Sequence, residues 1–123
     1  MTRDEYNDFC ESLPHTTHVV QWGNADVWKV GGKVFAIGGW QDNTDSDPHV
    51  TFKVSDMAFQ ILGEQEGLRP APYLASRGMK WIQRYRDDAM SDDDLREYLK
   101  ESHRLISLKL TKKLQRELGL NQD

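Results

Sequence analysis

The clearest pattern of apolar and polar positions lies in two strand-like runs that flank Gly31-Gly32, within residues 26–37. Two glycines between such runs are typical of a two-residue β-hairpin, because a type I′ turn needs positive φ at both central residues. The turn predicts four cross-strand pairs: Val30 with Lys33, Lys29 with Val34, Trp28 with Phe35, and Val27 with Ala36. Cross-strand partners share a face, so we expect one apolar surface made of Trp28, Val30, Phe35 and Ile37.

The rest of the pattern predicts further strands enclosed by helices. A Thr2/Glu5 capping box begins a helix that Pro14 ends, and residues 92–118 form one long helix or two with a bend near Ser102. Strands are expected at 18–22, 49–54 and 79–86, whereas the prolines within residues 69–74 argue against a regular strand there. After Ser55 we expect a short helix with four inward side chains: Met57, Ala58, Ile61 and Leu62.

This order predicts an α+β fold: an antiparallel sheet of about five strands, with the N- and C-terminal helices packed on one face. The chain has 123 residues and twelve aromatic side chains, so we expect residues 1–123 to form a single domain with its own core. No apolar run resembles a signal peptide or reaches membrane-spanning length. We therefore expect a monomeric cytoplasmic protein that makes no membrane contact.

Residues 79–86 separate aromatic from basic positions. Strand alternation places Trp81 and Tyr85 inward and turns the basic side chains to solvent, within a stretch, 67–86, that holds five basic and no acidic residues. The strand at 49–54 adds one lysine to the same solvent-exposed face. The expected phosphate-binding surface therefore comprises Lys53, Arg77, Lys80, Arg84 and Arg86. The alternative is an ordinary solvated sheet face, and the net charge of −4 argues against a general polyanion binder.

Each residue that could carry catalysis or bind a metal is better explained by a structural role. His15 and His18 lack a nearby Cys/His pair, and the carboxylates at 92–94 fit a helix N-terminus. The acidic residues of the first helix have the density of a solvated face. Cys10 lies on the apolar stripe of that helix, as an inert core thiol would. Gly31-Gly32-Lys33 lacks the other residues of a phosphate loop. We expect no enzyme activity and no cofactor.

Four segments together resemble the MmcQ/YjbR family. They are residues 28–36, residues 50–54, the run 70–74 followed by Trp81, and residues 94–106, where His103 replaces the tyrosine that is more usual there. The resemblance covers nearly the whole chain. It implies a frataxin-like (CyaY-like) α+β fold and DNA binding through a double wing of β-hairpins, and it brings no catalytic residues.

The leading functional prediction is therefore DNA binding through the basic face and the hairpin wings. The alternative is a protein-interaction module that offers a sheet edge or the aromatic side chains near Trp40, because an edge strand with unpaired amides accepts a partner strand.

Overall fold

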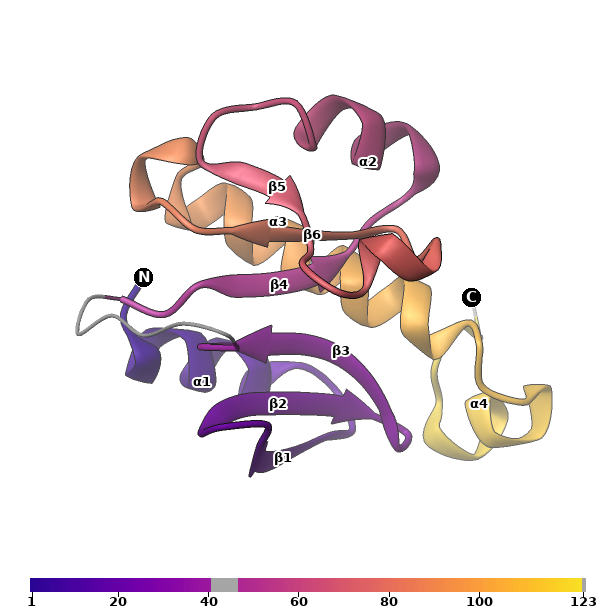
Figure 1. The fold of residues 1–123 in the computed structure, drawn as a ribbon. Helices are drawn as coiled ribbons and strands as arrows, with labels where there is room; N and C mark the ends of the chain where they lie inside the picture. The colour runs from indigo at the N-terminus through magenta and orange to yellow at the C-terminus, as the bar shows by residue number, and fades with distance from the viewer. Residues whose placement is uncertain (41–46, 123) are drawn as a thin grey trace.

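The computed structural model describes residues 1–40 and 47–122. Its centre is a six-stranded antiparallel sheet in the order β1-β2-β3-β4-β6-β5 (Figure 1). The strands are β1 (Thr16–Gln21), β2 (Ala25–Val30), β3 (Lys33–Gly38), β4 (Val50–Lys53), β5 (Leu68–Pro70) and β6 (Trp81–Arg84). The helices are α1 (Arg3–Ser12), α2 (Asp56–Leu62), α3 (Asp92–Ser107) and α4 (Lys112–Leu118), with 3-10 turns η1 (Ala75–Arg77) and η2 (Asp87–Ala89).

Helices α1 and α3 cover one face of the sheet, and the opposite face, turned to the viewer in Figure 1, carries no α-helix over its centre. This arrangement confirms the α+β class and the placement of the terminal helices. The additional strand is β5, a short edge strand that ends at Pro70. Proline is tolerated there because an edge strand leaves one row of amides without a ladder partner.

The β2–β3 hairpin has the predicted turn, with φ of 56° at Gly31 and 86° at Gly32. The pairs Val30/Lys33 and Lys29/Val34 are confirmed. The next predicted pairs are wrong: Trp28 lies opposite Ala36, and Val27 lies opposite Ile37. A β-bulge at this point places one additional residue, Phe35, on β3.

The bulge changes which side chains share a face. Phe35 and Ala36 both join the core beneath the helices, whereas Ile37 packs with Val27 and Ala25 in a second cluster. The predicted apolar surface is therefore correct for Trp28, Val30 and Phe35 and wrong for Ile37. The Ser102 hydroxyl of α3 donates to the Phe35 carbonyl at 2.6 Å, so the irregular backbone keeps a buried hydrogen bond.

Helix α1 begins with both hydrogen bonds of the predicted Thr2/Glu5 capping box. The C-terminal helical segment is two helices, but the break comes after Ser107 and Thr111 caps α4, so the predicted bend near Ser102 is wrong. In α2, Leu62 is buried as expected, but Met57 and Ile61 are exposed. Among the described residues, no helix is long and apolar enough to cross a membrane.

Candidate binding site on the open sheet face

On β6 Trp81 is buried as predicted, but the predicted exposure of Arg84 is wrong. Arg84 pairs with Val50, whose side chain lies in the core under the helices, and Gln83 pairs with Thr51 on the other face. Arg84 therefore points toward the helices, and its side chain is only 3 % exposed. Thr51 and Gln83 are also fully buried, so neither face of β6 is exposed to solvent at these positions.

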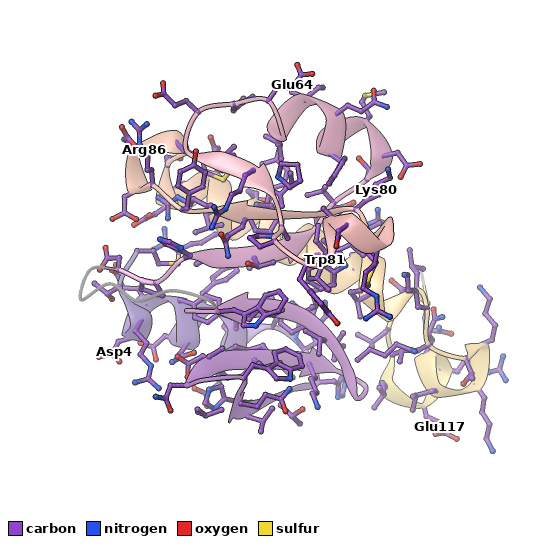
Figure 2. The ribbon with its side chains drawn as sticks, viewed as in Figure 1. Asp4, Glu64, Lys80, Trp81, Arg86 and Glu117 are labelled. Carbon is purple, nitrogen blue, oxygen red and sulfur yellow. The ribbon has the colours of Figure 1, made fainter. Side chains whose placement is uncertain are left out.

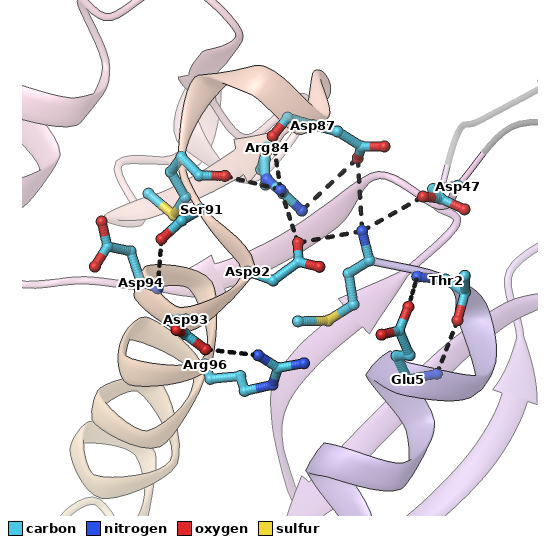
Figure 3. Close-up of polar contacts among 12 residues, drawn as sticks. Thr2, Glu5, Asp47, Arg84, Asp87, Ser91, Asp92, Asp93, Asp94 and Arg96 are labelled. Atoms are coloured by element: carbon cyan, nitrogen blue, oxygen red, sulfur yellow. Dashed lines mark hydrogen bonds and ion pairs between the residues drawn. The ribbon is translucent and has the colours of Figure 1, made fainter.

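Arg84 is held by polar groups near the start of α3 (Figure 3). Its Nη2 donates to the carbonyl oxygens of Asp87 and Met90 at 2.9 and 2.8 Å, and to Asp92 Oδ1 at 3.0 Å. The Met1 amine lies 3.2 Å from the same Asp92 oxygen. Burial raises the pKa of Asp92, but the hydrogen bonds and positive charges of Met1 and Arg84 outweigh it and lower that pKa. The Arg84 charge is therefore paired within the fold and does not face a ligand.

The other four predicted cations do not form one surface. Arg86 binds Asp88 and Glu66, and lies at one end of β6 while Lys80 lies at the other (Figure 2). The Lys80 ammonium sits 4.8 Å from the centre of the Phe59 ring of α2. Lys53 is half-buried, and burial, together with the charge of Lys109, lowers its pKa. Arg77 stands apart in η1 and is exposed. The predicted five-cation face is not assembled.

Arg77 instead borders a cavity of about 490 Å³ on the open sheet face. The cavity is lined by Trp22, Ile37, Trp40, Tyr73, Leu74 and Arg77, and we call it the aromatic pocket. Three segments supply it: the β1–β2 turn, the end of β3, and the loop from β5 through η1. The bulge contributes directly, because it turns Ile37 toward this face and so forms the floor.

The aromatic rings of the pocket are adjacent but do not cover one another. The Trp22 and Trp40 rings lie 5.9 Å apart at 44°, and the Trp40 and Tyr73 rings lie 6.4 Å apart at 87°. Trp22 is 50 % exposed and Tyr73 is 60 % exposed. Large aromatic side chains gathered in the open at one cavity mark a binding site more often than scattered exposed ones.

Both exposed rings are held by unusual backbone. Trp22 has φ of 54° and Tyr73 has φ of 72°, in the left-handed region that bulky side chains avoid. Such conformations persist when the surrounding structure imposes them, and they cluster at binding sites. Two residues with positive φ at one pocket therefore favour a binding role for this face.

A buried polar network supports the third ring. Gln83 Nε2 donates to the Trp40 carbonyl at 3.5 Å and to Thr51 Oγ1 at 3.3 Å. The guanidinium of Arg69 donates twice to Gln83 Oε1, at 2.9 and 2.6 Å, and lies 4.9 Å from the centre of the Tyr85 ring. Arg69 is therefore a second cation of the open face, fixed by its contacts, and the network anchors the backbone at Trp40.

Comparison with known proteins identifies the family. The family model described as YjbR matches residues 11–105. The chain belongs to the YjbR family. The crystal structure of the Deinococcus radiodurans protein DR2400, with the family-model domain DUF419, is similar at 26 % identity and a TM-score of 0.82, covering 97 % of this chain and 88 % of that one. No curated protein matches the chain in sequence.

Sequence reasoning missed most of the pocket of this YjbR domain. It singled out the aromatic side chains near Trp40 and included Arg77 among the cations, but it did not connect them. Trp22 was expected to end a strand, yet it begins a three-residue turn with positive φ through Asn24. The available signal was the number of aromatic residues beside turn-forming glycines and prolines.

Of the residues considered for metal binding and thiol chemistry, Cys10 is buried and His18 contacts a neighbouring carboxylate. Within residues 1–40 and 47–122, no group of three His, Cys, Asp or Glu side chains is placed to hold a metal ion. Cys10 is buried, and burial raises the pKa of its thiol far above the ordinary range. His18 Nε2 lies 2.9 Å from Asp26 Oδ1, a carboxylate that also accepts two hydrogen bonds from Arg3.

Proposed function

We propose that this YjbR domain binds nucleic acid by holding unpaired bases on its open sheet face. The observation that carries the proposal is the aromatic pocket, with three aromatic side chains and Arg77 around one cavity. Aromatic side chains bind single strands because every base has a π face, and each stacked base contributes about 1–3 kcal/mol. The cations beside the pocket add attraction for phosphate without reading sequence.

The proposal keeps nucleic acid as the ligand but places it at the aromatic pocket and not on the predicted five-cation face. Arg77 is the one residue of the predicted basic set that borders the pocket, and Arg69 lies on the same sheet face. Arg84 and Arg86 take no part, because their charges are bound by Asp92 and by Asp88 and Glu66. The double wing of hairpins implied by the family resemblance remains a prediction beside this one.

The salt dependence of binding separates the two surfaces. Two cations on a single strand predict a slope of log K against log salt of about −1.4. A five-cation face on duplex DNA predicts a slope of about −4 to −5. Fluorescence titrations with a single-stranded and a duplex oligonucleotide of the same sequence, each at several salt concentrations, measure both slopes.

A matched pair of variants locates the interface. Arg77→Gln should weaken binding of the single strand several-fold and flatten its slope, because one phosphate contact is lost. Arg86→Gln removes an equal charge at the far end of β6 and should bind like the wild type. Duplex binding as tight as single-strand binding, or equal effects of the two substitutions, would contradict the proposal.

A second candidate function is supported by the edge of the sheet that β1 forms. Strand β1 is the outer strand next to β2, and its Val19 and Val20 side chains are exposed. An edge strand with apolar side chains accepts a partner strand through its unpaired amides. If no oligonucleotide binds at low salt, this protein-interaction function becomes the leading one, and partner binding should then slow hydrogen exchange of the β1 amides.

A further inference from the structure

We propose that the unit recognised by the aromatic pocket is a single nucleotide, with its base against the rings of Trp22, Trp40 and Tyr73 and its phosphate on Arg77. The inference deepens the proposed function and rests on it where the base belongs to a nucleic-acid strand. It also applies to a free mononucleotide, which carries the same base and phosphate.

The size and shape of the pocket favour one base. A cavity of about 490 Å³ lies within the range of sites for small organic ligands, roughly 300–1,000 Å³. The ring of Tyr73 is nearly perpendicular to that of Trp40, at 87°, so their faces do not stack on each other. Ring faces that are not stacked on a neighbour and are half-exposed remain available to a planar ligand.

The charge of the lining selects an anionic ligand. Among the described residues that line the pocket, Arg77 carries the only charge. Its guanidinium lies 5.6 Å from the centre of the Tyr73 ring, and no carboxylate of the described residues lies within 4 Å of it. A planar guanidinium in this state offers two parallel N–H groups to a phosphate. The same charge disfavours a cationic ligand, although aromatic cages elsewhere bind quaternary ammonium groups.

The spacing of base and phosphate fits the order of the lining. The Arg77 guanidinium lies over the Tyr73 ring, Trp40 is the next ring along at 6.4 Å from Tyr73, and Trp22 follows at 5.9 Å from Trp40. An anion bound by Arg77 therefore lies beside the aromatic rings and leaves the space over Ile37 to the base. A ligand with an aromatic ring at one end and a phosphate at the other satisfies both ends at once.

Isothermal titration calorimetry with adenosine 5′-monophosphate, adenosine, inorganic phosphate and indole-3-acetate tests the inference. The wild type should bind the monophosphate at least tenfold more tightly than adenosine, and phosphate alone only weakly. Arg77→Gln should make the monophosphate and adenosine bind equally. Arg86→Gln, at the far end of β6, should keep the tenfold ratio.

A second variant removes the ring while keeping the fold. Trp22→Asn should weaken the monophosphate and adenosine alike by at least tenfold, because the stacking surface is lost from both. Asparagine adopts positive φ far more readily than tryptophan, so the turn should be retained, as a thermal melt will check.

Each result decides between the two proposals. Equal binding of the monophosphate and adenosine by the wild type, or equally tight binding of indole-3-acetate, overturns the inference. If a single-stranded oligonucleotide binds through Arg77 and no mononucleotide binds, the inference fails and the proposed function stands. If the mononucleotide binds as described and the oligonucleotide does not, the inference stands with a free nucleotide as ligand, and the proposed function fails.

Discussion

At the scale of single residues, Arg84 shows how one buried charge joins the sheet to the start of a helix. It extends from β6 to carbonyl groups of the η2 region and to Asp92 at the start of α3. Its Nε atom is buried without a hydrogen-bond partner in the described part of the chain. The residue therefore fixes the start of α3 against the sheet by charge and hydrogen bonds together.

Replacing Arg84 should be costly, whereas replacing Arg86 should not. Arg84→Met leaves two carbonyl groups without their donor and removes one of the two cations beside Asp92, and an unsatisfied buried polar group costs about 1–3 kcal/mol. Arg86→Met removes an exposed cation and should leave the denaturation midpoint nearly unchanged. Urea unfolding of both variants measures the difference. Equal midpoints for the two variants would show that the Arg84 contacts contribute little.

Asp26 makes the stability of the fold depend on pH. Burial raises the pKa of Asp26, but hydrogen bonds from Arg3 and His18 and their positive charges outweigh it, so the folded-state pKa lies below its ordinary value. A lowered folded pKa means that the carboxylate stabilises the fold above the unfolded pKa, about 3.9, and that this contribution disappears as the pH falls through the folded pKa.

Asp26→Asn should therefore unfold at lower urea concentration than the wild type at pH 7, and the gap should close as the pH falls below about 4. Urea unfolding at a series of pH values measures the gap. A gap that stays constant down to pH 2 would show that the side chain acts through its shape and not through its charge.

At the scale of elements, the β2–β3 hairpin decides which side chains reach each face of the sheet. Its turn brings two glycines into different surroundings. A Cβ atom at Gly31 would lie 2.6 Å from a methyl carbon of Leu110, in the segment between α3 and α4, whereas a Cβ at Gly32 would meet nothing within 4 Å. The hairpin is therefore packed against the C-terminal segment on one side of its turn only.

The same substitution at the two glycines should separate backbone freedom from packing. Asparagine tolerates positive φ, so Gly32→Asn should change the melting temperature little. Gly31→Asn meets the same backbone requirement but must displace Leu110, and overpacking of this kind costs about 1–3 kcal/mol. Thermal unfolding of both variants distinguishes them. Equal losses would place the cost in the turn itself and not in the contact with Leu110.

At the scale of the whole molecule, one sheet joins two apolar clusters. The larger lies under α1 and α3, and the smaller, around Val27 and Ile37, lies beneath the aromatic pocket. Both clusters use side chains of the same strands, so neither can lose its packing without disturbing the backbone of the other. This connection supports the prediction that residues 1–123 form a single domain.

Unfolding should accordingly be a single cooperative transition. Tryptophan fluorescence reports on both faces, since Trp28 lies in the helix-side core and Trp22 and Trp40 lie at the pocket. Far-UV circular dichroism reports mainly on α1 and α3. The two urea curves should coincide. A fluorescence transition at lower urea concentration than the loss of helix would show that the pocket side unfolds separately.

The sequence by itself determined the features that local chemistry controls. The Thr2/Glu5 box begins α1 through hydrogen bonds within one turn, and Gly31-Gly32 forms a tight turn because both positions need positive φ. The α+β class followed from the order of helical and strand patterns. The resemblance of four segments to the YjbR family was confirmed by the family model. None of these depends on knowing which distant segments meet.

Only the tertiary structure decided the faces of the strands and hence the candidate site. Alternation divides a strand into two faces but does not say which is buried. Both faces of β6 are covered, because Ile82 and Arg84 lie under the helices and Gln83 is buried on the other face by its contacts with Arg69 and Thr51. The bulge at Phe35 is compensated by Ser102 of α3, 67 positions along the chain. Arg84 is paired with Asp92 and hydrogen-bonded to two carbonyls between β6 and α3, and the aromatic pocket joins three separate turns. Tertiary contacts of this kind override local alternation, because their free energy is gained only once the chain has folded.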